Sequence, residues 1–458
     1  MKTVIDLFCG AGGTTTGVHL SGKAKVIACI NHDPVAIRSH AANHPDCKHY
    51  IEDIRLFDEK LLPKCDFITM SAECTHFSIA KGGESRDADS RTLSEELIRY
   101  ALHCEPTYII VENVKEFLSW SELVHKTDKK GNLVFKPNGQ PYLVPNVDKN
   151  QHGVLYRQWV KSIKAMGYEY KYKILNSADF GAYTSRERYF GIFAKKGNPI
   201  KFPPPTHAKN GSKYTLPKWN AVRKLLDMEN KGTSIFGRKK PLCENTLKRI
   251  YAGLQKFVPN QQNSWIVKFL SNNPNTGVNS GNSIDMPLAT ITTQNRLGVA
   301  SIAFIDSYKT NHVPTSLYYP LPTITTQGNK SLVSVSVFID EYYGKGKAKS
   351  IDKPCPTIPT VGRFSLVSCE SCEQDYTNYA YNGSQDDSQY TRLIKDFMHQ
   401  NGIEDIKMRM LTVQELKKIQ GFPEDYVLLG SETQQRKFIG NSVVPIVIQK
   451  IIENLYPN

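Results

Sequence analysis

The segment Thr3–Gly13, TVIDLFCGAGG, decides the fold of the chain. Its first six residues form a short apolar run of strand type, and the remaining five form a glycine-rich turn. Thr14–Leu20 then resumes with the pattern of a helix, and Val26–Ile30 reads as a second strand. A strand, a glycine turn, a helix and another strand are typical of a parallel α/β sheet, whose ligands bind at the carboxyl ends of the strands.

The same alternation continues along the first half of the chain. Phe67–Met70 and Tyr108–Val111 are buried-strand candidates, and helical patterns surround Ser94–Cys104 and Leu155–Met166. Tyr172–Ala194 reads as two more strands separated by a loop. Strand and helix at this spacing predict a doubly wound, Rossmann-like sheet.

The positive charge of the chain is concentrated in its middle. The 458 residues carry a net charge of +14, and Lys195–Glu370 alone holds 24 Lys+Arg against 9 Asp+Glu. The rest of the chain is nearly neutral, with 34 against 35. A basic block between neutral flanks suggests a module that binds a polyanion, inserted into a domain with another task, although a solvated surface would look the same.

This basic region also contains an internal repeat, within about residues 267–368. PLATITTQ at 287–294 recurs as PLPTITTQ at 320–327 and, more loosely, as PCPTIPTV at 354–361. Alternating Thr, Ile and Val predict a β-rich unit, which is either a plain structural duplication or the scaffold of a recognition surface. Beyond a polar linker, helical pattern returns from Leu411 to Gly421, and we expect the last helix over Asn441–Leu455.

Composition excludes several classes of protein. With 40% hydrophobic and 22% charged residues the chain is globular, and no apolar run reaches the ~20 residues of a membrane span. The N-terminus has no signal-peptide core, so we expect a cytoplasmic protein. The ten cysteines form no regular framework and the histidines show no ligand spacing, so we expect reduced thiols and no metal site.

Four residues at strand ends are candidates for chemistry before any family is considered. Asp33 follows the second strand, where an acidic side chain could bind a ribose, and Asp53 could cap a third strand. Cys74 follows the fourth strand and precedes a basic loop, so it is either an activated thiolate or a buried, inert thiol. Glu112 ends the fifth strand as either a helix-cap neighbour or a site acid.

Taken in order, six short motifs resemble the DNA cytosine-5 methyltransferase family across residues 1–194 and 405–458. They are DLFCGAGG at 6–13, CTHFS at 74–78, ENV at 112–114, RER at 186–188, QGFP at 420–423 and GNSVVP at 440–445. The resemblance implies a catalytic domain that uses S-adenosylmethionine and is interrupted by a variable target-recognition domain, where the basic repeat lies.

The resemblance also implies the catalytic residues. Cys74 would add to C6 of cytosine to make C5 nucleophilic, and Glu112 would hydrogen-bond or protonate N3. Arg186 and Arg188 would hold the base oxygen or a neighbouring phosphate. These atoms cannot be reached in a stacked duplex, so the target base must be flipped out.

For the cofactor, the resemblance implies contacts from the first three strands and from the C-terminal motif. We expect Asp6 to bind the cofactor beside the glycine turn, Asn31 and Asp33 to bind the ribose, and Asp53 to meet the adenine amino group. The other expected contacts are Phe8, Gly10, Gly12 and Asn441.

The chain departs from the family pattern beside these residues. Ala72 and Glu73 stand where members usually have two prolines, and Thr75 stands where they have Gln. Asn31 replaces the usual Glu at the second strand end, and Thr184 replaces a Gln before the two arginines. The departures suggest a divergent, phage-type branch.

We therefore expect residues 1–197 and 401–458 to form the catalytic domain and residues 198–400 the recognition domain. The expected partner is double-stranded DNA, bound by a monomer in a bacterial or phage-infected cell, with a cognate restriction endonuclease as a further candidate partner. Two alternatives stay open: an RNA (tRNA) cytosine C5 methyltransferase, and a catalytically silent DNA-binding relative. Cys74, Glu112 and Arg186 together speak against the silent relative.

Overall fold

The computed structural model describes most of residues 1–257 and 387–457 and a set of strands between them. Outside the described residues are 73–92, 129, 136–138, 147, 149, 212–215, 228, 231, 258–263, 269–281, 284–296, 308–329, 336–337, 342–346, 351–363, 372–386, 401–402 and 458. None of the described helices has both the length and the apolar character that crossing a membrane requires.

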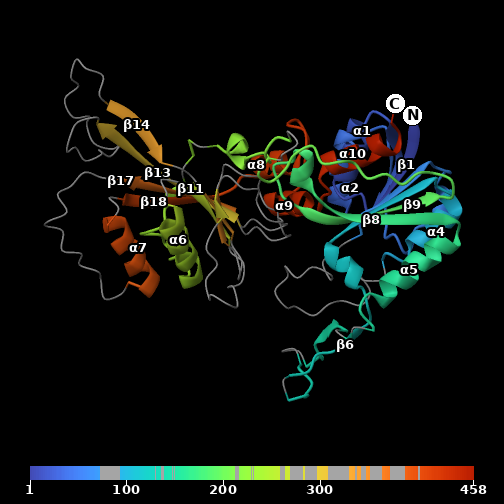
Figure 1. The fold of residues 1–458 in the computed structure, drawn as a ribbon, viewed down its shortest axis with the longest axis horizontal. Coiled ribbons are helices and arrows are strands. Elements are labelled where there is room, and N and C mark those ends of the chain that lie inside the picture. The colour runs from blue at the N-terminus through green and yellow to red at the C-terminus, as the bar shows by residue number, and fades with distance from the viewer. Residues whose placement is uncertain are drawn as a thin grey trace.

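A seven-stranded sheet forms the first lobe, on the right of Figure 1. Its order is β3-β2-β1-β4-β5-β9-β8, and the first five of these run parallel, whereas β9 is antiparallel to both of its neighbours. The predicted parallel α/β sheet is confirmed. The strands are β1 (Lys2–Leu7), β2 (Ala24–Asn31), β3 (Lys48–Ile51), β4 (Phe67–Met70), β5 (Tyr108–Asn113), β8 (Tyr168–Asn176) and β9 (Glu187–Lys195).

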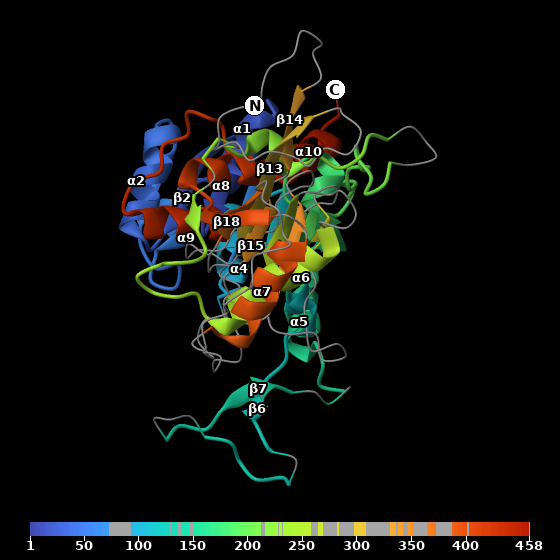
Figure 2. The same cartoon turned by 90° about the vertical axis from the view of Figure 1, so that its left-hand side faces the viewer.

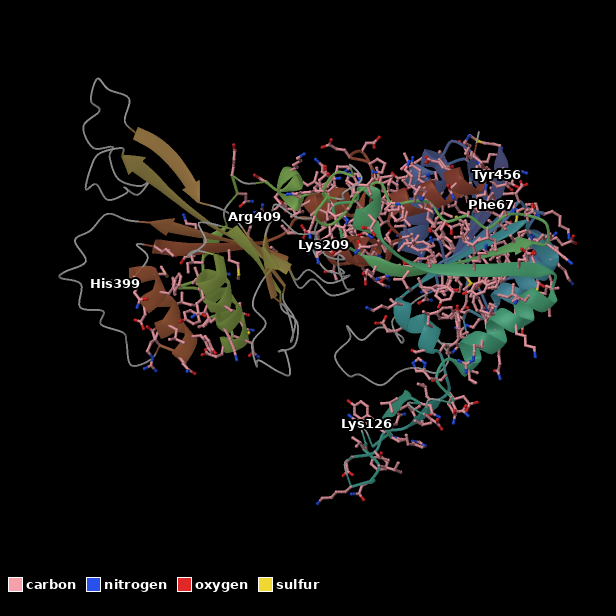
Figure 3. The ribbon with its side chains drawn as sticks, in the orientation of Figure 1. Phe67, Lys126, Lys209, His399, Arg409 and Tyr456 are labelled. Atoms are coloured by element: carbon pink, nitrogen blue, oxygen red, sulfur yellow. The ribbon has the colours of Figure 1, made fainter. Side chains whose placement is uncertain are left out.

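Helices cover both faces of this sheet, which explains why every residue of β4 and β5 is buried. Hydrophobic side chains of α4 and α5 pack on one face, and those of α1 and α10 pack on the other. Phe67, Tyr108 and Tyr456 form a group of aromatic rings on the second face; Figure 3 labels the first and last of them. The helices are α1 (Gly13–Leu20), α2 (Pro34–Asn43), α4 (Leu97–Cys104), α5 (Val154–Ala165), α8 (Val413–Gln420), α9 (Glu432–Asn441) and α10 (Pro445–Leu455).

The C-terminal helices differ from the expectation in one respect. The last helix was predicted over Asn441–Leu455, but Asn441 ends α9 and a separate helix, α10, starts at Pro445. Ser431 and Gln434 form a capping box that starts α9, and Pro445 stands in the first turn of α10, where its missing N–H costs nothing. The prediction of one helix was therefore wrong in its start and missed α9.

A second sheet of nine strands forms the other lobe, with α6 (Glu244–Phe257) and α7 (Gln389–Gln400) packed against each other beside it (Figure 1). Most of its pairings are antiparallel, as expected of a β-rich insert. The strands are β10 (Thr233–Ser234), β11 (Ser264–Lys268), β12 (Asn282–Ser283), β13 (Leu297–Ser307), β14 (Lys330–Val335), β15 (Phe338–Glu341), β16 (Lys347–Ser350), β17 (Phe364–Ser371) and β18 (Ile403–Met410).

The second sheet extends beyond residue 400, where we expected the recognition domain to end. β18 pairs with β10, β13 and β17, so Ile403–Met410 belongs to this sheet and not to the seven-stranded one. The three repeat motifs at 287–294, 320–327 and 354–361 lie outside the described residues.

A two-stranded arm projects from the first lobe between β5 and α5, as Figure 2 shows. Its strands are β6 (Leu123–His125) and β7 (Leu143–Pro145), and it carries Lys126, which Figure 3 labels. This arm was not expected from the sequence. Short 3-10 turns complete the fold: η1 (Glu59–Leu61), η3 (Lys115–Ser119), η4 (Ser177–Phe180) and η5 (Val222–Leu225).

Candidate active site

A pocket opens at the carboxyl ends of the central strands of the seven-stranded sheet. The space inside it is about 830 Å³, including the part open to solvent. Its lining residues follow the ends of four strands, precede β9, or come from the end of α9. They are Phe8, Cys9, Gly10, Ala11, Gly13, Thr14, Asn31, His32, Asp33, Ala36, Ser71, Ala72, Glu112, Arg186, Lys437, Phe438, Asn441, Ser442 and Val443.

The backbone after β1 forms the floor of this pocket and is held in an unusual conformation. Phe8 has φ +61° and Gly10 has φ +53°, both in the left-handed region that side chains disfavour. A Cβ at Gly10 would have no heavy atom within 4 Å, so this glycine faces open space. Strain at a ligand site is commonly functional, and here it exposes backbone to the pocket.

Gly13 allows the C-terminal segment to approach the start of α1. A Cβ at Gly13 would lie 1.8 Å from Ser442 Oγ and 2.5 Å from the Val443 carbonyl oxygen. Any other residue would push Ser442 and Val443 away, and both line the pocket. The glycine turn therefore also lets the two ends of the chain meet at one site.

Polar residues after β2 form one wall of the pocket. Asp33 caps α2 by accepting hydrogen bonds from the backbone N–H groups of Val35 and Ala36, at 2.9 and 3.2 Å. Asn31 Oδ1 accepts from the Asp33 N–H at 2.9 Å, which fixes the corner between strand and helix. Lys437 Nζ lies 3.8 Å from Asp33 Oδ2, so α9 is held against this wall.

Glu112 is the buried acid of the pocket and lies between two arginines. Its Oε1 is 3.3 Å from Arg188 Nε and 4.0 Å from Arg186 Nη2, and all three side chains are less than 10% exposed. Arg186 Nη1 also donates to the Gly440 carbonyl at 3.1 Å, which ties β9 to the end of α9. Two guanidinium groups offset the desolvation of the carboxylate, and Glu112 and Arg186 both reach the pocket.

Four of the expected site residues that the structure describes do not line the pocket. Arg188 contacts Glu112 from behind, and Gly12 packs against Tyr426, whose hydroxyl oxygen a Cβ would meet at 2.2 Å. Asp53 is partly exposed and forms an ion pair with Arg55 at 2.6 Å, which lowers the pKa of its carboxyl to about 2. Its contact with adenine stays a prediction.

Asp6 is the fourth of these residues and lies fully buried beneath the pocket. Thr69 and Thr15 donate hydrogen bonds to its two carboxylate oxygens at 2.8 and 2.9 Å. Burial raises its pKa to about 7 against the opposing effect of these hydrogen bonds. Its placement indicates support of the glycine turn from below and not direct contact with a ligand.

Cys74 lies outside the described residues, as do Glu73 and Thr75. The chain is described as far as Ser71 and Ala72, and both line the pocket. Thr184 is buried, and its hydroxyl makes no hydrogen bond to another described residue. The positions at which this chain departs from the family pattern therefore all lie on the pocket lining or close in sequence to a lining residue. They are Asn31, Ala72, Glu73, Thr75 and Thr184.

Sequence reasoning missed His32, Lys437 and Phe438 on the lining. His32 stands between two residues that were named, so its position could have been inferred. Lys437 and Phe438 precede Asn441 by four and three residues, so they share one face of a helix. Because no helix ending at Asn441 was expected, the positions of Lys437 and Phe438 beside Asn441 could not be inferred from the sequence.

Comparison with protein families identifies the family of the chain that forms this pocket. The model of the C-5 cytosine-specific DNA methylase family matches residues 2–130 and 144–457, which is nearly the whole chain. The chain belongs to this family. The methylase model leaves out residues 131–143, which make up much of the projecting arm.

Several curated relatives of this methylase match over a little less than half of the chain. Type II methyltransferase M.AquIA of Picosynechococcus sp. is 28% identical over 218 residues, which cover 45% of this chain and 77% of that protein. Type II methyltransferase M1.HphI of Haemophilus parahaemolyticus is 27% identical over 215 residues, covering 45% and 50%. Apart from the first, the chain spans about half the length of the curated relatives it matches.

Solved structures agree on the fold of the methylase. A mutant of Spodoptera frugiperda DNMT2 aligns with a TM-score of 0.50 at 14% identity, covering 99% of both chains. S. pombe Dnmt2 aligns with a TM-score of 0.50 at 15% identity, covering 99% and 98%. The predicted class of enzyme, a C5 cytosine methyltransferase that uses S-adenosylmethionine, is confirmed at the level of the family.

Proposed function

We propose that this methylase transfers a methyl group from S-adenosylmethionine to C5 of a cytosine within a defined sequence of double-stranded DNA. One observation carries the proposal: the pocket joins the strained glycine turn after β1 to the buried Glu112 and Arg186. A cofactor cradle and an acid with an arginine partner thus share one cavity, and Ser71 and Ala72 on its lining lead in sequence to Cys74.

The residues of the pocket fit S-adenosylmethionine. Gly10 leaves open space above exposed backbone, Phe8 and Phe438 offer apolar surface, and Asn31 and Asp33 offer polar groups to a ribose. We assign Phe8, Gly10, Asn31, Asp33 and Asn441 to cofactor binding, with Asp6 and Gly12 shaping the turn and Asp53 kept as a candidate contact for adenine. When bound, the cofactor supplies an electrophilic methyl group.

The chain's own residues would prepare the cytosine. Cys74 would lose its proton and add through sulfur to C6, and the electron pair of the C5–C6 double bond would move to C5. Glu112 would hold or donate a proton at N3, where negative charge collects, with Arg186 and Arg188 holding Glu112 in place. After C5 takes the methyl group, loss of its proton and of Cys74 restores the ring.

The basic middle of the chain is assigned to DNA binding. The excess of 15 positive charges over Lys195–Glu370 falls on a segment that contributes most strands of the second sheet. Such an excess suits a phosphate backbone, and a flipped-out cytosine would then enter the pocket of the first lobe. The relatives' designation as Type II methyltransferases supports a role in restriction and modification, with a cognate endonuclease as partner.

The test uses the full-length protein with S-adenosylmethionine labelled in its methyl group. We expect label in unmethylated duplex DNA and not in tRNA, and sequencing of the product should find 5-methylcytosine within one short motif. A duplex with 5-fluorocytosine in that motif should trap a covalent adduct, because C5 then has no proton to lose. Label in tRNA alone would instead support the RNA methyltransferase, and an absence of label and adduct would support a silent DNA-binding protein.

A further inference from the structure

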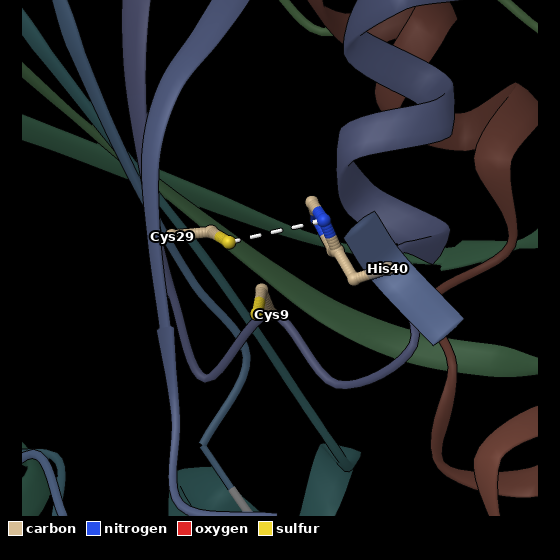
Figure 4. Close-up of side chains that lie close together, drawn as sticks. All are labelled: Cys9, Cys29 and His40. Atoms are coloured by element: carbon tan, nitrogen blue, oxygen red, sulfur yellow. Dashed lines mark hydrogen bonds between the residues drawn. The ribbon is translucent and has the colours of Figure 1, made fainter. Parts of the chain in front are cut away.

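A cluster of thiol and imidazole side chains lies beneath the glycine turn, and the proposed reaction assigns no role to any of them; Cys9 alone among them also lines the pocket. Cys9, Cys29 and His40 are buried, and their ligand atoms lie within 4.8 Å of one another (Figure 4). Cys29 also belongs to a second group of the same span, with Cys47 and His49. The five residues come from the turn after β1, from β2, from α2 and from the start of β3.

His40 carries its ring proton on one nitrogen, and the lone pair of the other, Nδ1, contacts His49 Nε2 and would bind a metal ion in its place. Thr15 donates its hydroxyl proton to Asp6 at 2.9 Å, so Thr15 Oγ1 accepts from His40 Nε2, also at 2.9 Å. Nε2 therefore carries the ring proton, and Nδ1 presents a lone pair. A ligand histidine is commonly held in this way, through its second nitrogen, by an oxygen acceptor that is itself hydrogen-bonded.

This lone pair faces the other members of the cluster. His40 Nδ1 lies 3.8 Å from Cys29 Sγ and 2.8 Å from His49 Nε2. In tetrahedral zinc sites with bonds of 2.0–2.3 Å, neighbouring ligand atoms are about 3.3–3.8 Å apart. Within each of the two groups the ligand atoms lie at most about 1 Å farther apart than this, and the two imidazole nitrogens lie about 0.5 Å closer. Cys9 and His49 belong to different groups, so binding one ion through both needs a further adjustment of the side chains.

We propose that Cys9, Cys29, His40 and His49 bind one Zn²⁺ ion. Two thiolates and two neutral imidazoles balance the charge of the ion, and a neutral site suits a core that also contains Val4, Val18 and Val26. Taking Cys47 in place of His49 would leave a net negative charge there.

The ion would join the cofactor turn to the rest of the sheet. Cys9 lines the cofactor pocket, and its carbonyl accepts from the Gly12 N–H at 3.0 Å. Cys29 lies on β2, and His40 lies on α2, the helix that Asp33 caps. A metal bond to Cys9 would fix the strained turn between Phe8 and Gly12 against two neighbouring elements without touching the reacting atoms.

The first measurement is the metal content of the full-length protein, purified from cells grown with zinc and without chelator. We expect about one zinc per chain, as for a structural Cys/His site, and a Tm that chelator lowers. Cys29→Ser and His40→Gln should remove the zinc and the effect of chelator. Cys104→Ser is the matched control, because Cys104 is as fully buried as Cys29 but lies outside the cluster, and it should keep the zinc.

A second measurement keeps the proposal open to refutation if the variants fail to fold. Metal-stripped wild-type protein is titrated with Co²⁺, and we expect thiolate-to-cobalt charge-transfer absorption that Zn²⁺ abolishes. Failure of the wild type to take up either ion would overturn the site, as would a disulfide found by intact mass in the untreated protein. Loss of zinc from Cys47→Ser together with its retention in His49→Gln would overturn the choice of the fourth ligand.

Discussion

The two sheets of this methylase differ in what they carry. The seven-stranded sheet has strands buried on both faces and bears the pocket at its carboxyl edge. The nine-stranded sheet is built largely from the segment that carries the positive excess, and none of its described strands contributes a residue to the pocket lining. Cofactor binding and DNA binding should therefore be separable by mutation.

The largest effect on the rate of methyl transfer is expected from substitution of Cys74, which tests the role of the first lobe. Cys74→Ser should lower the rate of methyl transfer by about four orders of magnitude or more, because a serine hydroxyl is a far weaker nucleophile than a thiolate. Cofactor affinity, measured by calorimetry, and DNA affinity should stay within about twofold, since no binding group is removed. Substantial transfer by this variant would move the nucleophile to another residue.

Glu112→Gln should have the next largest effect. Gln keeps the shape of Glu112 but neither its charge between Arg186 and Arg188 nor its capacity to deliver a proton, so the rate should fall by about 10²–10⁴. Loss of the buried anion should also lower the free energy of unfolding, by about 3–5 kcal/mol at most. Glu187→Gln is the control, because this neighbouring acid is exposed, and an equal loss of rate there would refute the role of Glu112.

Charge reversal on the second sheet should weaken DNA binding and leave the first lobe intact. For Lys347→Glu with Lys349→Glu on β16, we expect at least about tenfold weaker DNA binding and a shallower salt dependence, by about 0.9 for each DNA phosphate that the variant no longer neutralises. Cofactor affinity should not change. The control variant carries Glu in place of the exposed Lys25 and Lys48 of the first sheet. If both pairs of substitutions weakened DNA binding equally, DNA binding would not be specific to the second sheet.

The smallest effect is expected at the wall of the cofactor pocket. Asp33→Ala removes the cap of α2 and should cost about 1 kcal/mol of stability by thermal unfolding, together with some cofactor affinity. Asp33→Asn keeps a capping oxygen and should retain the stability while losing the charge near Lys437. Equal cofactor affinity in the wild type, Asp33→Ala and Asp33→Asn would show that Asp33 caps α2 and does not bind the cofactor.

Much of the first lobe could be predicted because its signals are local. Short apolar runs such as Phe67–Met70 coincide with strands, and parallel strands bring their carboxyl ends together, so Phe8, Asn31 and Glu112 could be expected at one site. Gly12 and Asp6 were expected to contact the ligand, but side-chain packing against Tyr426, Thr15 and Thr69 keeps them off the lining.

Features assembled from distant segments could not be found in this way. The two groups that share Cys29, one with Cys9 and His40 and the other with Cys47 and His49, have no repeated spacing along the chain, so no metal site was expected there. Only the packing of α2 over β1, β2 and β3 brings these side chains together. α9 was missed because its buried residues are few and it is followed after three residues by a strongly apolar helix.

The approach of Ser442 to Gly13 has a consequence for the biosynthesis of the protein. One side of the cofactor cavity is made within the first 36 residues, whereas Lys437, Asn441 and Val443 leave the ribosome more than 400 residues later. A growing chain thus carries only half a cavity, and full affinity for the methyl donor must await the end of translation. The basic segment emerges before that point, so a nascent chain could meet nucleic acid before it can modify it.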